Sequence, residues 1–343
     1  MSKSCEFPTG KVPPEVLKDI VFRRLGVSSN RVILGPRVGE DAAVIEMGDR
    51  VLVLATDPIT GAVRNIGWYV IHINANVVSA CGARPLWFFC TILLPVGAKK
   101  ALLKEIMGDM DRAAKELSIS IIGGHSETTP GLSRPILVGF MIGETTKEKY
   151  VSTSGAMVKD VLILTKGAGI EGTAVLASDL DKILEEKQIE KGVIAKARGF
   201  ISSISVVKEA ITAMEAGEVH SMHDPTEGGI LNGIWEMAEA SNKGVIIFKE
   251  KIMIARETKI LCKALEIDSL KILGSGALLI AVKQKDAKKI VSAIIDKGIK
   301  ASIIGEITPL KKGRWIVDKE GTREKILPIT QDHVYKILDR YGL

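Results

Sequence analysis

Short runs of apolar residues along the chain alternate with longer segments in which apolar residues recur at helical spacing. The short runs are rich in Val, Ile and Leu and end at glycine, proline or acidic residues, as buried strands do. They predict strands at 31–34, 42–46, 50–55, 85–94, 118–122, 134–143, 159–165, 244–248, 276–283, 299–307 and 313–317. The helical pattern predicts helices at 15–25, 62–81, 97–117, 170–191, 195–216, 228–241, 256–266 and 331–340. Several strands follow one another near the start, so the pattern favours an α+β fold over strict βαβ alternation.

A polar and charged segment at residues 145–155 divides the predicted elements into two comparable sets. The chain has 343 residues, and because a domain commonly holds about 100–200, two domains are expected. We predict one domain over residues 1–155 and a second over 156–343. Both halves close with a similar segment, Met141–Thr146 and Ile303–Thr308. This similarity indicates either an old duplication or two strands that happen to end in the same kind of turn.

Composition and charge indicate which classes of molecule the protein binds. The apolar fraction of 46% and the charged fraction of 26% are those of a globular protein with a sizeable core. Aromatic residues make up only 4%, which argues against a protein that stacks nucleic-acid bases on aromatic side chains. The net charge of +6 is not concentrated in a basic tail or stripe. We therefore do not expect nucleic-acid binding, and favour anionic small molecules as ligands.

The cysteines and the most apolar run indicate the cellular compartment of the protein and whether it spans a membrane. Cys5, Cys81, Cys90 and Cys262 form no CxxC pair, and the first residues contain no apolar core of a signal peptide. These features predict reduced thiols in a cytoplasmic protein, with the last three cysteines as buried apolar residues. The most apolar run, Pro85–Val96, is too short to span a bilayer and predicts a buried strand, so no membrane partner is expected.

Four short segments interrupt the apolar pattern with acidic residues and glycine. They are Gly39–Ala43, Thr56–Pro58, Gly123–Glu127 and His223–Gly229, and each lies at the end or start of a predicted strand. A carboxylate is costly to bury there unless it meets a cation or hydrogen-bond donors. Mg²⁺ is commonly held by one or two carboxylates together with substrate phosphates, so such segments meeting at one cleft would suit a magnesium nucleotide. Each segment taken alone also fits an ordinary turn or a helix cap.

The segment that begins at Asp224 carries the most specific signal. Gly228 and Gly229 at the start of a predicted helix could expose backbone N–H groups to a phosphate. Lys11, which follows Gly10, could reach a phosphate as well, although a lone lysine is more often a solvated surface residue. The sequence contains no Walker A motif and no GxGxxG after a strand. The five histidines are dispersed, so a zinc site is not expected.

Together and in order, these segments resemble the superfamily of aminoimidazole ribonucleotide (AIR) synthase, HypE, thiamine-monophosphate kinase and selenophosphate synthetase. The resemblance covers most of the chain, and the motifs are most similar to those of HypE-like, AIR-synthase-related proteins. Its motifs are Gly10-Lys11, Gly39–Val44, Thr56–Pro58, Asn74–Asn76, Gly82–Pro85, Gly123-Gly124, Asp224–Gly229, Gly274–Gly276 and Ile304–Glu306. The resemblance implies an N-terminal α/β domain whose sheet pairs with that of a second subunit, and a C-terminal α/β sandwich domain. It also implies that ATP binds with Mg²⁺ in the cleft, partly across the homodimer.

The resemblance implies roles for individual residues as well. Asp57 and Lys11 would be catalytic, and Asp41, Asp57 and Asp224 would bind the metal. The implied nucleotide-binding residues are Asp41, Asn76, Gly123, Gly124, Asp224, Gly228 and Gly229. Members of the superfamily use ATP to phosphorylate an oxygen or selenium of a small substrate, in some cases to drive a dehydration. The implied function is ATP-dependent and Mg²⁺-dependent phosphoryl transfer to, or dehydration of, a small molecule.

Three departures from the superfamily pattern favour an alternative. Val77 stands where relatives have a metal-binding aspartate, and His125 stands where several have an acidic residue. The chain ends in Asp339–Leu343 without the reactive terminal cysteine of HypE, so a HypE-type reaction on a terminal thiol is doubtful. The alternative is a non-catalytic nucleotide-binding or assembly protein that kept the dimeric fold and acts on a maturation-type protein partner.

Overall fold

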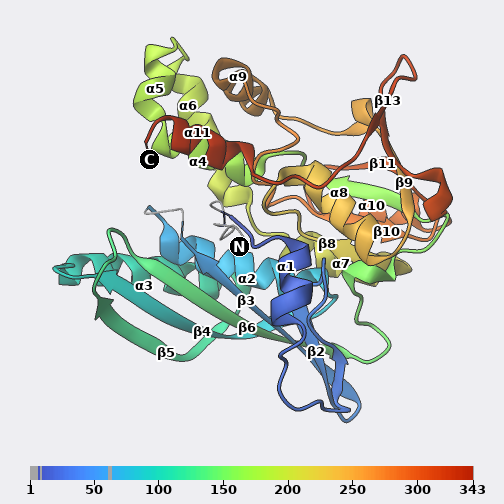
Figure 1. Cartoon of the computed structure of the whole chain (residues 1–343), viewed down its shortest axis with the longest axis horizontal. Helices are drawn as coiled ribbons and strands as arrows, with labels where there is room; N and C mark the ends of the chain where they lie inside the picture. Colours follow the sequence, from blue (N-terminus) through green and yellow to red (C-terminus); the bar gives the residue numbers. More distant parts are fainter. Residues whose placement is uncertain (1–6, 8–9, 61–63, 343) are drawn as a thin grey trace, which may run out of the picture.

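The computed structural model describes residue 7 and residues 10–60 and 64–342. It contains two sheets with helices packed against them, one in each half of the chain (Figure 1). Most neighbouring strands are antiparallel, so the predicted α+β class is confirmed. Strands of the first sheet end at Thr146, and strands of the second begin at Val161. The predicted boundary at residue 155 falls between them.

The N-terminal sheet has six strands. Their order is β1 (Val32–Leu34), β2 (Ala42–Met47), β3 (Arg50–Ile59), β6 (Ile136–Thr146), β4 (Arg84–Pro95) and β5 (Ser120–Thr129). Only the β4–β5 pair is parallel. Helices α2 (Ile66–Ala80) and α3 (Lys100–Leu117) lie on one face of this sheet (Figure 1). Every residue of α2 is buried because the sheet, α3 and the C-terminal half surround it.

The other face of the N-terminal sheet carries apolar side chains, and no helix of the described part of the chain covers it (Figure 1). Phe89 on β4 is 36% exposed, and its ring lies 6.1 Å from that of Phe140 on β6. The strand predicted over 85–94 is thus present, but residues facing α2 are buried whereas many facing the other way stay partly exposed. An apolar sheet face of this kind commonly marks an interaction surface.

The C-terminal sheet has seven strands. Their order is β13 (Arg323–Lys325), β12 (Arg314–Val317), β9 (Gly244–Phe248), β11 (Ala301–Thr308), β7 (Val161–Thr165), β10 (Leu279–Val282) and β8 (Val219–His223). Helices α7 (Val207–Ala216) and α10 (Ala287–Asp296) pack on one face, and α8 (Gly229–Ala240) packs on the other. Leu162 and Leu164 of β7 contact the α8 side and Ile163 the other side, which explains the continuous apolar run at 159–165.

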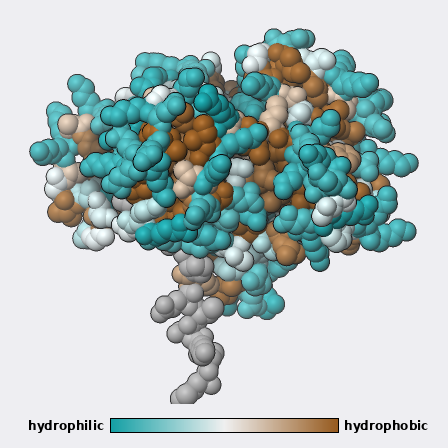
Figure 2. All heavy atoms as spheres, turned by 90° about the horizontal axis from the view of Figure 1, so that it is seen from above, coloured by the Kyte–Doolittle hydropathy of each residue, from teal (hydrophilic) through white to brown (hydrophobic). Residues whose placement is uncertain are grey.

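Further helices form a separate apolar cluster beside the C-terminal sheet. They are α4 (Ile170–Asp179), α5 (Asp181–Glu186), α6 (Lys191–Arg198), α9 (Arg256–Leu265) and α11 (His333–Arg340). Seen from above, hydrophilic residues cover most of the surface, and hydrophobic side chains gather in patches between them (Figure 2). Among the described residues, we find no helix with the length and apolar character needed to cross a membrane.

Several elements differ from the predictions. The helix predicted at 195–216 is interrupted by a 3₁₀ turn at Gly199–Ser203, and the helix at 170–191 is divided into α4 and α5. The N-terminal helix is short, with α1 at Pro14–Val16 followed by a π turn at Leu17–Val21. The strand predicted at 118–122 continues as β5 through the glycines expected to end it. The elements β8, β13 and α10 were not predicted.

A clamp between the two halves explains the interruption after α6. The amide of Asn76 on α2 donates to the Ile204 carbonyl and accepts from the Val206 backbone N–H, each at 2.8 Å. Lys166, at the end of β7, donates to the carbonyls of Ser203 and Ser205 at 2.9 and 2.5 Å. The two Asn76 bonds join the two halves, the two Lys166 bonds lie within the C-terminal half, and together they keep residues 203–206 out of an α-helical path.

The predicted environment of the cysteines is confirmed for the residues described. Cys81, Cys90 and Cys262 are buried free thiols, and burial raises the pKa of Cys90 and Cys262 to about 12. They are therefore inert apolar side chains. Cys5 lies outside the described residues.

Candidate nucleotide site between the two domains

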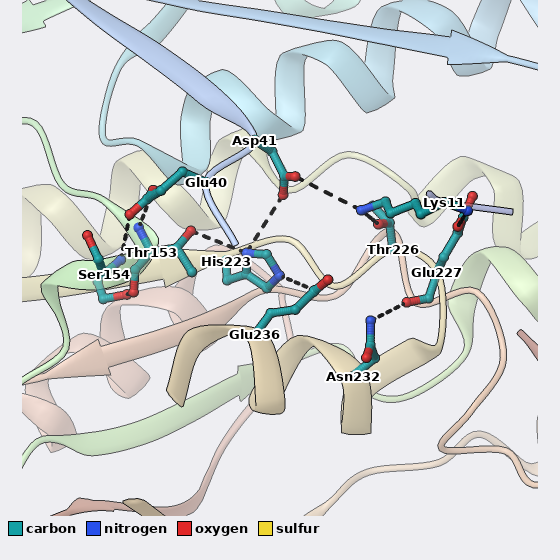
Figure 3. Close-up of polar contacts among 11 residues, drawn as sticks. Lys11, Glu40, Asp41, Thr153, Ser154, His223, Thr226, Glu227, Asn232 and Glu236 are labelled. Atoms are coloured by element: carbon teal, nitrogen blue, oxygen red, sulfur yellow. Dashed lines mark hydrogen bonds and ion pairs between the residues drawn. The ribbon is translucent and has the colours of Figure 1, made fainter. Parts of the chain in front are cut away.

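The candidate site lies where the N-terminal sheet faces the loop before α8 (Figure 3). Asp41 precedes β2, and Lys11 reaches across from the N-terminal segment. The Lys11 Nζ lies 3.2 Å from the Thr226 hydroxyl and 4.0 Å from a carboxylate oxygen of Asp41. The Lys11 backbone N–H donates to the Glu227 carboxylate at 3.0 Å. One lysine therefore joins groups of both domains.

The surroundings of Lys11 stabilise its protonated form. Partial burial lowers its pKa, but the carboxylates of Asp41, Glu236, Glu227 and Asp57 outweigh this and raise the pKa above its ordinary value. Several carboxylates thus converge on one ammonium group. The arrangement shows that this part of the cleft favours a cation.

A buried histidine supports the same carboxylate from the other side. His223, the last residue of β8, lies with its Nε2 2.9 Å from Glu236 and its Nδ1 4.0 Å from Asp41. Burial lowers the pKa of His223, but Glu236 and Asp41 outweigh it and the pKa is raised. The carboxylate of the adjacent Glu40 accepts hydrogen bonds from the Thr153 and Ser154 backbone N–H groups at 3.0 and 2.8 Å, which fixes the backbone next to Asp41. Asp41 is thus positioned by contacts on both sides (Figure 3).

Asp57 lies on β3 in the same cleft. The side chain of Asn74 fixes its backbone, accepting from the Asp57 N–H at 2.9 Å and donating to its carbonyl at 3.2 Å. Burial and repulsion by Asp41 raise the pKa of Asp57 to about 7, although Lys11 opposes this. The carboxyl group is therefore poised to lose its proton when a cation arrives.

Asp224 and Glu171 form a deeper acidic pair. Asp224 is 4% exposed, and neither of its carboxylate oxygens has a hydrogen-bond partner among the described residues. Burial raises its pKa well above the ordinary value. Glu171, in the first turn of α4, has a pKa raised by burial to about 7. A buried carboxyl without a partner is costly, so this position is suited to a ligand that supplies a cation or a donor.

The predicted metal ligands do not surround a single point. Within residues 10–60 and 64–342, no three His, Cys, Asp or Glu side chains are close enough to hold a metal ion. The oxygen ligands that Mg²⁺ prefers are present in Asp41, Asp57 and the unpartnered Asp224, but not as a preformed cage. Such a set fits a magnesium ion that takes its remaining ligands from substrate phosphates and water.

The two glycines before α8 have a structural explanation. Gly228 and Gly229 adopt φ angles of +77° and +65°, which favour glycine. A Cβ on Gly229 would lie 2.5 Å from the Ile272 carbonyl oxygen. The Gly228 N–H donates to the Asp332 carboxylate at 2.7 Å, and the Gly229 N–H donates to the Thr226 carbonyl at 3.2 Å. Their backbone donors are occupied within the chain, so a phosphate contact is not needed to explain them.

The other predicted nucleotide-binding residues differ in their positions. Both polar atoms of the Asn76 amide are used in the interdomain clamp, and the same amide lies beside Asp224 and lowers the pKa of that carboxyl. Gly123 and Gly124 are exposed on β5, the edge strand farthest from β1 in the sheet order. Within one chain they are not part of the cleft. Val77 packs in the apolar core of the N-terminal half, and the side chain of His125 forms a hydrogen bond with Glu127 on its own strand, at 3.1 Å.

Some residues of the cleft were missed by sequence reasoning. Glu171 follows the glycine-rich segment after the strand at 159–165, so the rule that selected the other strand-end carboxylates would also have found it. Glu236 and Asp332 carry no such signal. The first lies inside a helix, and the second precedes α11 far along the chain.

Comparison with known families decides the classification. Residues 39–145 match the N-terminal domain of AIR synthase related proteins, and residues 158–318 match the C-terminal domain. The chain belongs to the AIR synthase related family. The resemblance stated from the motifs is therefore confirmed, as is the two-domain architecture.

Relatives in this AIR synthase related family include hydrogenase-maturation proteins. A putative hydrogenase expression/formation protein of Methanocaldococcus jannaschii is 29% identical over 328 residues, which cover 93% of this chain and 95% of the relative. The carbamoyl dehydratase HypE of Rhizobium leguminosarum bv. viciae is 24% identical over 280 residues, or 79% of this chain and 77% of that protein.

Solved structures of the family share the fold. HypE in its complex with HypF superposes with a TM-score of 0.77 at 23% identity, covering 92% of this chain and 99% of that one. HypE in complex with ATP gives a TM-score of 0.71 at 18% identity, with coverage of 96% and 98%. AaThiL complexed with AMPPCP and TMP gives 0.72 at 18% identity, with coverage of 95% and 100%.

The raised pKa of Asp57 predicts a dependence of stability on pH. The folded protein holds the Asp57 proton more tightly than the unfolded chain, so stability falls as pH rises from about 4 to about 7. Asp57→Asn removes this penalty, and we expect it to raise the free energy of unfolding by about 2 kcal/mol at pH 8 after allowing for partial exposure. The gain should vanish below pH 4. Urea unfolding without divalent cations measures both, and a gain that is equal at all pH values would contradict the assignment.

Proposed function

We propose that this protein is an ATP-dependent, Mg²⁺-dependent enzyme that transfers the γ-phosphoryl group to a small substrate or uses it to dehydrate that substrate. The observation that carries the proposal is the cleft in which Lys11 and the carboxylates Asp41 and Asp57 face Thr226 and Glu227 of the other domain. The ATP and AMPPCP complexes of proteins with the same fold support it.

The proposed mechanism relies on charge and position. Mg²⁺, when bound, would neutralise phosphate charge as the phosphoryl group leaves. Asp41 and Asp57 would hold that ion, and Lys11 would exchange its carboxylate partners for phosphate oxygens. Glu236 and Asp41 raise the pKa of His223, which favours a second positive charge at the edge of the cleft. The unpartnered Asp224 carboxyl would face the ligand from the deeper side. Such fixed charges stabilise a transition state because they need no rearrangement.

Calorimetric titration of ATP into the purified protein, with and without MgCl₂, tests the proposal. We expect binding that requires Mg²⁺, accompanied by slow phosphate release that a substrate accelerates. AMP run beside ATP controls for binding through the adenine alone. Failure of ATP to bind under any metal condition would refute an ATP-dependent function.

A homodimer forms part of the same proposal. The uncovered sheet face around Phe89 and Phe140 is apolar, and Gly123 and Gly124 reach a nucleotide site only if a second chain brings them there. We expect Phe89→Lys to convert a dimer into a monomer, measured by light scattering after size-exclusion chromatography. Ile295→Lys, at an exposed apolar residue on α10, is the matched control. A wild-type monomer, or a Phe89→Lys dimer, would contradict the predicted pairing.

A second candidate function is a non-catalytic nucleotide-binding or assembly protein. Val77, in place of a superfamily aspartate, packs in the core, and no three potential ligands meet in the described part of the chain. The structure of HypE with HypF supports a maturation-type protein partner. ATP that binds without turnover in the presence of candidate substrates would favour this function. Turnover that Asp57→Asn abolishes would exclude it.

A further inference from the structure

A cavity separate from the carboxylate cleft lies where the start of α2 faces α4 and α6. Its volume is about 140 Å³, and residues of both domains line it, among them Arg64, Tyr69, Ser178, Asp179 and Arg198. One liquid water occupies about 30 Å³, so the cavity has room for a carboxylate or phosphate group with a few further atoms. None of the sequence motifs and none of the proposed site residues falls in it.

The charges around this cavity favour an anion. Arg64 makes no hydrogen bond or ion pair with any residue in the described ranges. Arg198 uses Nε for the Ala177 carbonyl at 2.9 Å and Nη2 for Asp181 at 2.8 Å, which leaves its Nη1 available. Burial raises the pKa of Asp179, while Arg64 and a third arginine, Arg134, lower it.

These side chains give the cavity an excess of positive charge. Two arginines, Arg64 and Arg198, and one carboxylate, that of Asp179, line the cavity. Arg198 is held by its two contacts, and Arg64 is an exposed residue of the cavity wall. A guanidinium presents paired N–H donors that match the two oxygens of a carboxylate or phosphate.

Tyr69 adds a polar group to the wall of the cavity. The residue is 5% exposed, and no hydrogen bond joins its hydroxyl to another of the residues described, so this donor is available to a ligand in the cavity. Burial, and then the charges of Glu171 and Asp179, raise the pKa of Tyr69, so the hydroxyl is a neutral donor. The charge of Glu171 in the candidate site therefore acts on Tyr69 at the wall of the cavity.

We propose that the cavity binds the anionic head group, a carboxylate or a phosphate, of a small polar molecule through Arg64, Arg198 and the Tyr69 hydroxyl. That the molecule is the substrate of the phosphoryl transfer rests on the proposed function. Because the charge of Glu171 acts on Tyr69 at the cavity wall, the rest of the molecule extends toward Asp224 and the site of reaction. Specificity for the acceptor then comes from the charged cavity, and ATP is held by the separate carboxylate cleft.

Calorimetry on the full chain, free of nucleotide and magnesium, tests the inference with inorganic phosphate, glycerol 3-phosphate and succinate as probes. We expect one probe to bind with one site per chain. Arg64→Gln should weaken its binding about tenfold, and Tyr69→Phe by a few-fold. Asp57→Asn and Arg323→Gln, an exposed arginine on β13, should leave it unchanged. Arg64 is exposed, so its replacement does not threaten folding.

Three results would overturn the inference: no probe binds, Arg64→Gln binds as the wild type does, or Asp57→Asn loses binding equally. The third would place the probe in the carboxylate cleft. Binding of phosphate or glycerol 3-phosphate but not succinate would assign the cavity to phosphates, and the reverse to carboxylates. This titration contains no ATP, so its result does not depend on ATP turnover. Failure of turnover would refute the proposed function, and failure of probe binding would refute the anion site in the cavity.

Discussion

Replacing Lys166 by methionine should lower the free energy of unfolding by about 3–5 kcal/mol. Its ammonium lies 2.7 Å from Glu209, whose side chain is only 1% exposed, and it also donates to the carbonyls of Ser203 and Ser205. Methionine preserves much of the volume but leaves a buried carboxylate without its cation. The segment between α6 and α7 loses two of its hydrogen bonds as well. Urea denaturation at pH 7 measures the difference.

Two further variants separate charge from packing in this prediction. Lys166→Met combined with Glu209→Met should recover much of the lost stability, because no buried charge is then left unpaired. Lys283→Met removes a partner of Glu218 in an ion pair whose side chains are 48% and 46% exposed, and should cost under about 1 kcal/mol. If Lys166→Met cost no more than Lys283→Met, the buried ion pair between Lys166 and Glu209 would not stabilise the C-terminal half in the way predicted.

Replacing Asp57 by asparagine should reduce ATP turnover about 100- to 1000-fold. The substitution keeps the shape of the side chain and the backbone contacts with Asn74, but removes the negative charge that would hold the magnesium phosphate complex. We also expect the affinity for ATP with Mg²⁺ to fall by at least about tenfold. Single-turnover phosphate release measures the first effect, and calorimetry the second.

The control for Asp57→Asn lies in the same hairpin. Asp49 is exposed in the turn between β2 and β3, at the opposite end of β3 from Asp57. Asp49→Asn removes the same charge from the molecule and should leave turnover and affinity unchanged. Equal losses in the two variants would mean that net charge, and not position in the cleft, governs ATP use.

The strands with a clear apolar pattern could be predicted because their surroundings are simple. The run at 159–165 is apolar on both faces since β7 lies in the middle of a sheet covered on both sides. By contrast, β8 contains His220 and His223 and carries little apolar signal, yet it is an edge strand stabilised by pairing with β10. The break after α6 could not be predicted, because its cause is hydrogen bonding from Asn76 and Lys166, which are far away in sequence.

The candidate site was predictable in its parts but not in its arrangement. Acidic residues at strand ends identified Asp41, Asp57 and Asp224, since burying a carboxylate without a purpose is costly. The same reasoning could not show that Asn76 serves the interdomain clamp, or that the Gly228 N–H is already bound by Asp332. Those outcomes depend on which groups the folded chain brings within hydrogen-bond distance.

The sequence by itself determined the family, the two-domain α+β architecture and the acidic character of the cleft, because these follow from local pattern and from motifs in a fixed order. Only the tertiary structure decided that Lys11 joins Asp41 to Thr226, that the charge of Glu171 acts on Asp224, and that two arginines from different domains line one cavity. The physical reason is that charge interactions, burial and hydrogen bonds act over a few ångströms in space, between residues that the chain separates by tens to hundreds of positions.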